Sequence, residues 1–401
     1  MKTNSFIIDA IRTPIGSLGG KLSSIRADDL AALTISSLVA RHDFDTSQID
    51  EVILGCANQA GEDNRNIARM ALLLAGIPFN IPGETINRLC ASGMSAVIHA
   101  HRAIKSGDGD LFISGGVEHM TRAPWIISKA SKSFGRDSQL EDSSFGWRFI
   151  NSKMEDLYGI DSMGQTAEHL AERFNISRDD QDQFAYQSQK KAKIARDNDV
   201  FKKEIIPVEV IQNKKSSIFV DTDEFMKPET TIEVLNKLKP VFKKDGTVTA
   251  GTSSGLNDGS ASMLIGSENA IEKFSFNPIA RILSSAVVGV EPKFMGIGPV
   301  KASLKALLKA NLSLDDMNII EINEAFSAQV LACIRELGLK YDDDRINPNG
   351  GAIALGHPLG MTGTRIIQTA ALQLKRTNLK YALITMCVGV GQGYAVIIER
   401  V

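Results

Sequence analysis

The hydrophobic pattern of the first 120 residues alternates between strand-like and helix-like segments. Short apolar runs predict strands, and apolar residues at helical spacing, such as Leu30, Leu33 and Leu38, predict amphipathic helices. The expected strands are 5–9, 51–54, 84–87 and 111–114, and the expected helices are 28–41, 64–74 and 92–105. Because strands that alternate with helices favour a largely parallel sheet flanked by helices, the pattern predicts an α/β protein.

From residue 121 to residue 248 the alternation breaks down, and Ser, Lys, Asp and Gln become frequent. Ser177 and Asp180 form a capping-box pattern, with Asp in place of the usual Glu, that predicts a helix through about Arg196. The lysines of 190–193 are expected on a solvated helix face. The region is therefore interpreted as an inserted, mostly surface domain that covers the site.

After Gly251 the alternation returns. The expected helices are 300–310, 324–337 and 362–374, and the expected strands are 318–322, 381–386 and 394–398. Segments 110–116 and 380–389 share a pattern, an apolar strand followed by glycines, which hints at a duplicated half.

Composition narrows the class of protein. The chain has 401 residues, 43% hydrophobic and 23% charged, as in ordinary soluble globular proteins, and its net charge of −2 indicates neither nucleic-acid nor anionic-membrane binding. Its four cysteines form neither a disulfide framework nor a zinc-spaced cluster, so no metal is expected. The N-terminus carries no signal or transit pattern and no apolar run is long enough to span a membrane, so we expect a cytoplasmic protein.

Cys90 is the most informative residue, because it stands where a strand-like run ends and a helical pattern begins. A thiol at the start of a helix meets the positive end of the peptide dipoles, which favours the thiolate. Most free cysteines are packing residues, but strand ends of this kind are where α/β proteins place their sites. Cys90 is therefore a candidate nucleophile.

Three further residues complete a candidate set. His357 lies in a glycine-dense stretch, 349–363, and is a candidate base for Cys90, although an isolated histidine is usually structural. Cys387 is either a buried strand-end residue or a second acid/base, with a thiol pKa near about 8.5 suited to proton transfer, and the glycine loop that follows could supply oxyanion donors. Asn323 either caps a helix or holds a water against a developing oxyanion. Together they favour acyl transfer on a thioester.

The chain resembles the thiolase family over essentially its whole length. The motifs that carry the resemblance are 9–14, 87–93, 249–251, 254–259, 323–326, 349–363 and 387–393, in this order. The resemblance implies the thiolase fold: two βαβαβαββ halves in five αβαβα layers with an inserted loop domain. The expected division is an N-terminal half at 1–120 completed by about 249–272, a loop domain at 121–248 and a C-terminal half at 273–401.

The resemblance also implies a role for each candidate. Cys90 would be the acylated nucleophile, His357 its activator and Cys387 the acid/base. Asn323 would hold a water that binds the thioester oxygen together with His357, and the N–H groups of Cys90 and Gly389 would form a second oxyanion hole. Further implications are a homotetramer of tight dimers, acyl-CoA substrates, and coenzyme A as a co-substrate with no tightly bound cofactor.

The coenzyme A contacts implied by the resemblance depart from the family pattern in places. Ser254 matches a residue near the pantetheine amide, and Met163, Ala325 and Phe326 match its apolar lining. Lys227 stands where an arginine that contacts coenzyme A is common, which keeps a cation but loses planar stacking. Two other departures are Thr252, in place of a usual Asn, and Ser162, where acetoacetyl-CoA thiolases usually carry His.

Stretches 53–66, 146–149 and 290–292 resemble the 3-oxoadipyl-CoA thiolases of aromatic-compound breakdown. A substrate of that kind needs a cation for its distal carboxylate, and Arg65 and Arg148 are candidates, with ordinary surface pairing as the alternative for each. The rivals are an acetoacetyl-CoA thiolase, a decarboxylating ketosynthase, which Cys387 disfavours, and a non-catalytic acyl-CoA-binding protein. We expect thiolysis of 3-oxoadipyl-CoA, which would place the protein in aromatic-compound or fatty-acid metabolism.

Overall fold

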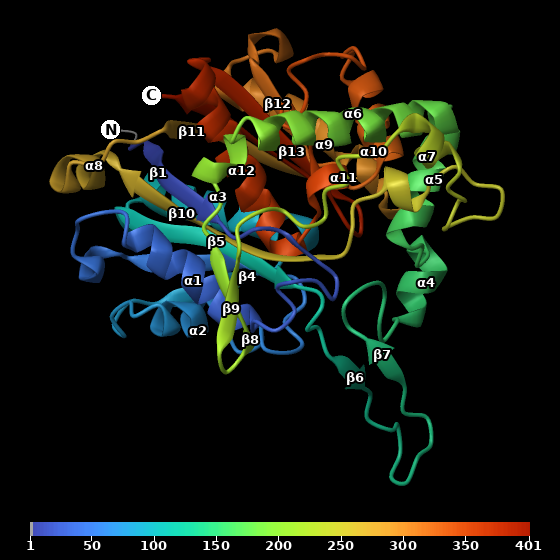
Figure 1. Cartoon of the computed structure of the whole chain (residues 1–401), viewed down its shortest axis with the longest axis horizontal. Helices are drawn as coiled ribbons and strands as arrows, with labels where there is room; N and C mark the ends of the chain where they lie inside the picture. Colours follow the sequence, from blue (N-terminus) through green and yellow to red (C-terminus); the bar gives the residue numbers. More distant parts are fainter. Residues whose placement is uncertain (1–2) are drawn as a thin grey trace.

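The computed structural model describes residues 3–401 and forms one mixed sheet from two halves (Figure 1). The first half has the strand order β4–β3–β5–β10–β1, and the second has the order β12–β13–β14–β11. The strands are β1 (Ser5–Arg12), β3 (Glu51–Gly55), β4 (Gly83–Ile86), β5 (Leu111–His119), β10 (Asn257–Ser267), β11 (Ala280–Gly289), β12 (Ile319–Ile322), β13 (Tyr381–Val388) and β14 (Gln392–Arg400). The halves meet where β1 pairs with β11, at Phe6–Arg281 and Ile7–Ala280.

The two halves repeat one arrangement. An isolated parallel bridge between Ile320 and Ile346 lies beside β12 in the position that β4 occupies beside β3. When that bridge is counted as a strand, the strands of both halves have the same spatial order in the sheet, and β5 is the counterpart of β13. The duplication indicated by segments 110–116 and 380–389 is confirmed.

The prediction of a largely parallel sheet was wrong. Pairing is parallel between β3 and β4, β3 and β5, and β12 and β13, whereas β10, β1, β11 and β14 pair antiparallel with their neighbours. Because the alternation of strands and helices reports only the βαβ part of each half, it missed the antiparallel part. Strand β10 begins Asn257-Asp258-Gly259-Ser260, a polar run that resembles a loop, yet all its residues are buried.

Helices separate and cover the half-sheets. Helices α1 and α2 pack on the outer face of the first half, α3 and α12 lie between the halves, and α9 and α10 belong to the outer face of the second. Their bounds are α1 (Ala27–Val39), α2 (Ile67–Leu74), α3 (Ser92–Ser106), α9 (Gly298–Ala310), α10 (Ser327–Glu336) and α12 (Leu359–Thr377). This sequence of layers confirms the five-layer thiolase fold.

Glycines allow α3 and α12 to approach closely. A Cβ on Gly93 would lie 2.4 Å from the Gly360 carbonyl oxygen, and one on Gly363 would lie 2.3 Å from the Met94 nitrogen. Part of the glycine-dense stretch around His357 is therefore needed for helix packing.

Two helices begin later than expected, each for a local reason. Helix α2 begins at Ile67 because Asn66 is left-handed (φ 63°) and its side chain accepts from the Arg69 N–H. Helix α10 begins at Ser327 because Phe326 is extended and bridges to Ser253.

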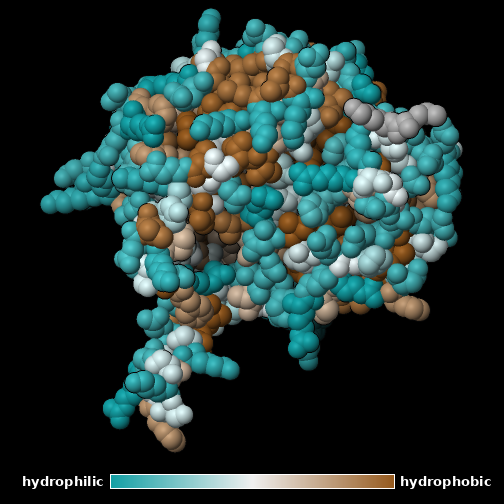
Figure 2. All heavy atoms as spheres, turned by 180° about the vertical axis from the view of Figure 1, so that it is seen from behind, coloured by the Kyte–Doolittle hydropathy of each residue, from teal (hydrophilic) through white to brown (hydrophobic). Residues whose placement is uncertain are grey.

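The segment between β5 and β10 is not uniformly superficial. Its hairpin of β6 (Trp125–Ile127) and β7 (Leu140–Asp142) projects from the body, as Figure 1 and Figure 2 show. By contrast, α5 and α6 pack on α10. Its other elements are α4 (Ser152–Tyr158), α5 (Met163–Arg173), α6 (Arg178–Asp197), β8 (Val208–Asn213), β9 (Ser216–Val220) and α7 (Ile232–Asn236).

Helix α6 opens as the sequence predicted, because Ser177 and Asp180 form both bonds of a capping box. Its lysine run is solvated only in part, since Lys191 donates to the Ile346 carbonyl at 2.8 Å. The remaining short elements are β2 (Gly16–Ser17), α8 (Glu268–Phe274) and α11 (Ala352–Leu355). None of the helices within residues 3–401 combines the length and the apolar character needed to cross a membrane.

Candidate active site

Cys90 lies in a single 3₁₀ turn, η2 (Leu89–Ala91), between β4 and α3. Leu89 has a left-handed backbone (φ 46°), an uncommon conformation for a branched apolar residue, so the turn is sharp. The turn packs against β13 and α12, which both belong to the second half of the chain. The candidate nucleophile therefore stands where the two halves face each other.

The helix start favours the thiolate of Cys90 as the sequence predicts, but burial has the larger effect on its pKa. Burial raises the pKa of the Cys90 thiol to about 11, although the N–H groups of Gly389 and Cys90 face the sulfur and lower it in part. Because desolvation disfavours the charged form more than these donors favour it, Cys90 rests as a thiol. The two N–H groups are those that the sequence named for an oxyanion hole.

Cys387 lies near the end of β13, with 1% of its surface exposed. It belongs to an apolar cluster that also contains Ala325, Phe326 and Met163. Burial raises its pKa well above the ordinary value, and the neighbouring Cys90 raises it further. The expectation of a thiol that titrates near neutral pH was therefore wrong: Cys387 rests protonated.

His357 lies between α11 and α12, and hydrogen bonds hold both its ring and its backbone. Its Nδ1 is 2.7 Å from Thr362 Oγ1, and its backbone N–H donates to Asn257 Oδ1 at 2.9 Å. Its Nε2 is buried and has no hydrogen-bond partner within the described chain. Burial lowers the pKa of His357 to about 3, with a further contribution from Arg365, so the imidazole is neutral and able to accept a proton.

Asn323 follows β12, and its N–H donates to the Thr385 carbonyl at 3.0 Å, close to Cys387 along β13. Its side chain is buried, yet neither Oδ1 nor Nδ2 has a hydrogen-bond partner among residues 3–401. Leaving such an amide unpaired costs about 1–3 kcal/mol, which is unusual in a packed interior. The helix-cap interpretation does not apply, because α10 begins at Ser327 with Phe326 at its N-cap.

Four of the five residues assigned to coenzyme A lie together. Met163, Ala325 and Phe326 share the apolar cluster of Cys387, and the Ser254 N–H donates to the Ala325 carbonyl at 3.0 Å. A Cβ on Gly389 would lie 3.7 Å from Met163 Sδ, which places this lining beside the Gly389 N–H. Lys227 differs: it is exposed and no described contact joins its side chain to the cluster.

Besides Lys227, the two other departures from the family pattern, Ser162 and Thr252, have local structural roles. Ser162 caps α5 and exchanges capping-box bonds with Gln165. Thr252 is buried in a short turn, where its hydroxyl accepts from the Thr249 N–H at 2.9 Å.

Sequence reasoning missed Glu118, a buried carboxylate at the end of β5. It accepts the N–H groups of Ala57, Asn58 and Gly360 at 3.0, 2.9 and 2.8 Å. It thereby ties the loop after β3 to the first turn of α12, next to His357. The duplication was the signal that could have found it, because the end of β5 is the counterpart of the end of β13, where Cys387 lies.

Cys56, Asp63 and Glu118 bring their ligand atoms within 4.8 Å of one another. Their oxygens are already committed, since Asp63 accepts the N–H groups of Gln59 and Gly61 and the thiol of Cys56. The group therefore holds loops together.

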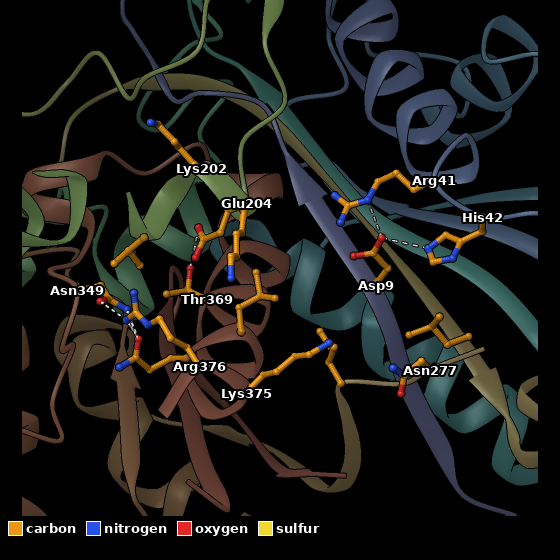
Figure 3. A pocket seen from close by; sticks show the side chains of 16 residues that line it. Asp9, Arg41, His42, Lys202, Glu204, Asn277, Asn349, Thr369, Lys375 and Arg376 are labelled. Atoms are coloured by element: carbon orange, nitrogen blue, oxygen red, sulfur yellow. Dashed lines mark hydrogen bonds and ion pairs between the residues drawn. The ribbon is translucent and has the colours of Figure 1, made fainter. Parts of the chain in front are cut away.

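A cavity of about 620 Å³ lies apart from these residues, between β1, the end of α1 and the last turns of α12 (Figure 3). Asp9 pairs there with Arg41 and His42, and Glu204 accepts from Thr369. None of the candidate catalytic residues lines this cavity.

The raised pKa of Cys90 predicts its reactivity. We expect the rate of Cys90 alkylation by iodoacetamide to keep rising between pH 7 and pH 10, because the thiolate fraction grows until the pH exceeds a pKa of about 11. An ordinary cysteine would approach a plateau near its pKa of about 8.5. Mass spectrometry of the Cys90 peptide measures the rate, with the exposed model thiol of glutathione as the reference. A plateau below pH 9 would contradict the prediction.

Comparison with known proteins reveals relatives over the full chain. The family models "Thiolase, N-terminal domain" and "Thiolase, C-terminal domain" match residues 5–269 and 276–400. The "Beta-ketoadipyl-CoA thiolase" of Acinetobacter baylyi is 53% identical over 399 residues, 99% of this chain and 100% of the relative. The "3-oxoadipyl-CoA/3-oxo-5,6-dehydrosuberyl-CoA thiolase" of Escherichia coli K12 is 54% identical over 399 residues, 99% of each chain.

The solved structures agree with this similarity. The crystal structure of human mitochondrial 3-ketoacyl-CoA thiolase in complex with CoA superposes with a TM-score of 0.92, at 41% identity. The match covers 100% of this chain and 98% of the human chain.

Proposed function

This chain belongs to the thiolase family and is an acyltransferase, and from that premise we propose that it cleaves 3-oxoadipyl-CoA with coenzyme A to succinyl-CoA and acetyl-CoA. Among the described residues, the unpaired buried amide of Asn323 carries the proposal for the site, and the neutral imidazole of His357 and the neighbouring thiols of Cys90 and Cys387 support it. The names of the relatives that match over the whole chain carry the proposal for the substrate.

In the first half-reaction the Cys90 sulfur attacks the 3-keto carbon while its proton passes to His357 Nε2. Since the free enzyme holds a neutral thiol and a neutral imidazole, the proton moves as the C–S bond forms. The C2–C3 bond then breaks, its electron pair stays on C2 as the enolate of acetyl-CoA, and the Cys387 thiol protonates that carbon. Acetyl-CoA leaves, and Cys90 carries a succinyl thioester.

In the second half-reaction coenzyme A takes the succinyl group. The Cys387 thiolate left by the first step removes the proton of the coenzyme A thiol, whose sulfur attacks the thioester carbonyl. Cys90 leaves as a thiolate and recovers its proton from His357. The N–H groups of Cys90 and Gly389 would stabilise the oxyanion on the acyl-enzyme, and a water on Asn323 with His357 would stabilise the thioester oxygen of the enolate.

The same proposal covers coenzyme A binding. It is a co-substrate that would lie along Met163, Ala325, Phe326 and Ser254, with the exposed Lys227 available to its phosphates. The side-by-side placement of the first four supports this assignment.

A substrate panel tests the proposed function. We expect thiolysis of 3-oxoadipyl-CoA with a kcat/KM at least about tenfold above that of acetoacetyl-CoA, because a substrate carboxylate that meets a cation contributes about 1.5–3 kcal/mol. Acetyl-CoA and succinyl-CoA, quantified by liquid chromatography, are the expected products. A preference for acetoacetyl-CoA would favour the rival acetoacetyl-CoA thiolase, and no turnover of any 3-oxoacyl-CoA would favour a binding protein.

We also propose that the protein is a homotetramer, assembled as a dimer of dimers, and that its β6–β7 hairpin contacts a second copy. The hairpin exposes Trp125, Ile127, Phe134 and Leu140, an apolar set that is costly to leave in water. Sedimentation of the wild type and of a W125S/I127S/L140S variant checks this, with a tetramer expected to become a dimer. An unchanged mass would place the contact elsewhere.

Two further proposals concern organisation and place. The N-terminal half comprises residues 1–120 and 249–272, and the C-terminal half comprises residues 273–401. The loop domain 121–248 is inserted in the first half, and limited proteolysis should cut first within it.

A cytoplasmic location is supported by four free cysteines and is checked by cell fractionation.

A further inference from the structure

Arg148, between β7 and α4, carries a positive charge with no carboxylate partner. Its guanidinium donates to two backbone carbonyls, Ser143 O at 3.0 Å and Asn58 O at 3.4 Å. The side chain is partly buried, and no Asp or Glu of residues 3–401 forms an ion pair with it. Carbonyls orient the guanidinium without neutralising it, so its charge remains available to an anion.

One of these carbonyls belongs to the loop that adjoins the Cys90 turn. The Asn58 N–H donates to Glu118 at 2.9 Å, and the carbonyl of the preceding Ala57 accepts from Asn87 Nδ2 at 3.0 Å, three residues before Cys90. Strand β3 itself touches the start of α3, since a Cβ on Gly55 would lie 2.2 Å from the Ser92 carbonyl carbon. Arg148 is therefore attached to the loop that contacts the residues just before Cys90.

The preceding residue is attached to the opposite side of the site. Trp147 Nε1 donates to the Asp161 carbonyl at 3.2 Å, two residues before Met163. Met163 lies beside Gly389, whose N–H faces the Cys90 sulfur. Residues 147–148 thus connect the loop after β3, which contacts Asn87, with the start of α5, which adjoins Gly389.

Arg65, the other candidate from the sequence, is placed less well. Its neighbour Asn66 donates to the Gly83 carbonyl at 2.7 Å, and Gly83 is the first residue of β4, whereas Cys90 follows the last. Arg65 is exposed and forms no ion pair within the described residues. The alternative of ordinary surface pairing therefore applies to neither arginine.

From this arrangement we propose that Arg148 binds the distal carboxylate of the acyl chain and selects dicarboxylic 3-oxoacyl-CoA substrates. The inference rests on the proposed function, because a succinyl group on Cys90 ends in the carboxylate that Arg148 would receive. A planar guanidinium held by two carbonyls is pre-oriented for a bidentate carboxylate. An unbranched neutral chain of the same length gains nothing from it.

Two substrates and two variants test the proposal. The substrates are 3-oxoadipyl-CoA and 3-oxohexanoyl-CoA, which have the same chain length but differ in charge at the distal end. The variants are Arg148→Gln, which keeps polar donors but removes the charge, and Arg65→Gln as the matched control. We expect Arg148→Gln to lower kcat/KM for 3-oxoadipyl-CoA by about 10- to 100-fold, mainly through KM, and to leave 3-oxohexanoyl-CoA within about twofold. Arg65→Gln should leave both values unchanged.

Each other outcome has a distinct meaning. Equal losses on both substrates, or no loss on either, would overturn the assignment of Arg148 while the wild-type preference for 3-oxoadipyl-CoA still supports the proposed function. A selective loss in Arg65→Gln alone would transfer the role to Arg65. A wild type that favours 3-oxohexanoyl-CoA would overturn both proposals.

Discussion

Replacing Cys90 with alanine is expected to lower kcat for thiolysis of 3-oxoadipyl-CoA by about 10⁴-fold or more, because the acyl group then has no atom to carry it. His357 keeps its neutral Nε2 in the variant but has no thiol to deprotonate. Release of acetyl-CoA, measured by liquid chromatography, gives the rate. Intact mass spectrometry after addition of succinyl-CoA should show one succinyl adduct on the wild type and none on the variant.

The control for this experiment is Cys56→Ala, which removes another buried thiol outside the site. That variant should still acquire the succinyl adduct. An adduct on Cys90→Ala, or more than about 1% of the wild-type rate, would show that the acyl group is carried elsewhere or that no acyl-enzyme is required.

Cys387→Ala is expected to separate the two half-reactions. Thiolysis should fall by about 10²- to 10⁴-fold, because the enolate that leaves when the C2–C3 bond breaks loses its proton donor. Acylation of Cys90 by succinyl-CoA breaks no carbon–carbon bond, and the coenzyme A thiolate can leave without a proton from Cys387. The succinyl adduct should therefore still form, although more slowly than on the wild type. The high pKa of the Cys387 thiol supports its role as the acid, since it holds its proton throughout the neutral range.

Cys333→Ala is the matched control, because Cys333 is also fully buried, with a thiol pKa of about 12, and lies near Cys387. It donates to the Gly296 carbonyl at 3.2 Å and has no role in the proposed reaction. Thiolysis by Cys333→Ala should remain within about threefold of the wild type. Equal losses in Cys333→Ala and Cys387→Ala would indicate a packing effect instead of proton transfer.

Where the sequence predicted well, the information was local. The amphipathic spacing of Leu30 and Leu38 marked α1, and Ser177 with Asp180 marked the start of α6. The expectation of a largely parallel sheet was wrong, because the antiparallel strand β10 begins with polar and small residues whose burial comes from neighbours far along the chain. Glu118 escaped notice for the same reason: its three N–H donors come from two distant segments.

The ionisation states depend on burial, which the sequence interpretation did not take into account. A helix terminus favours a thiolate, and both N–H groups that face Cys90 do lower its pKa. Burial opposes them and is the larger effect, as it is for Cys387 and His357. Since the extent of burial is a property of the assembled halves, no local motif reports it.

The sequence alone determined which chemical groups are present, and it marked those strands and helices whose periodicity or capping depends on near neighbours in the chain. It also sufficed to identify the family, and its motifs named the candidate residues of the site. Only the tertiary structure decided that the turn of Cys90 meets β13 and α12. It also decided that, among residues 3–401, Asn323 and His357 keep unpaired buried atoms and Arg148 has no counter-ion. These properties depend on contacts between segments that folding brings together, and on the water that such contacts exclude.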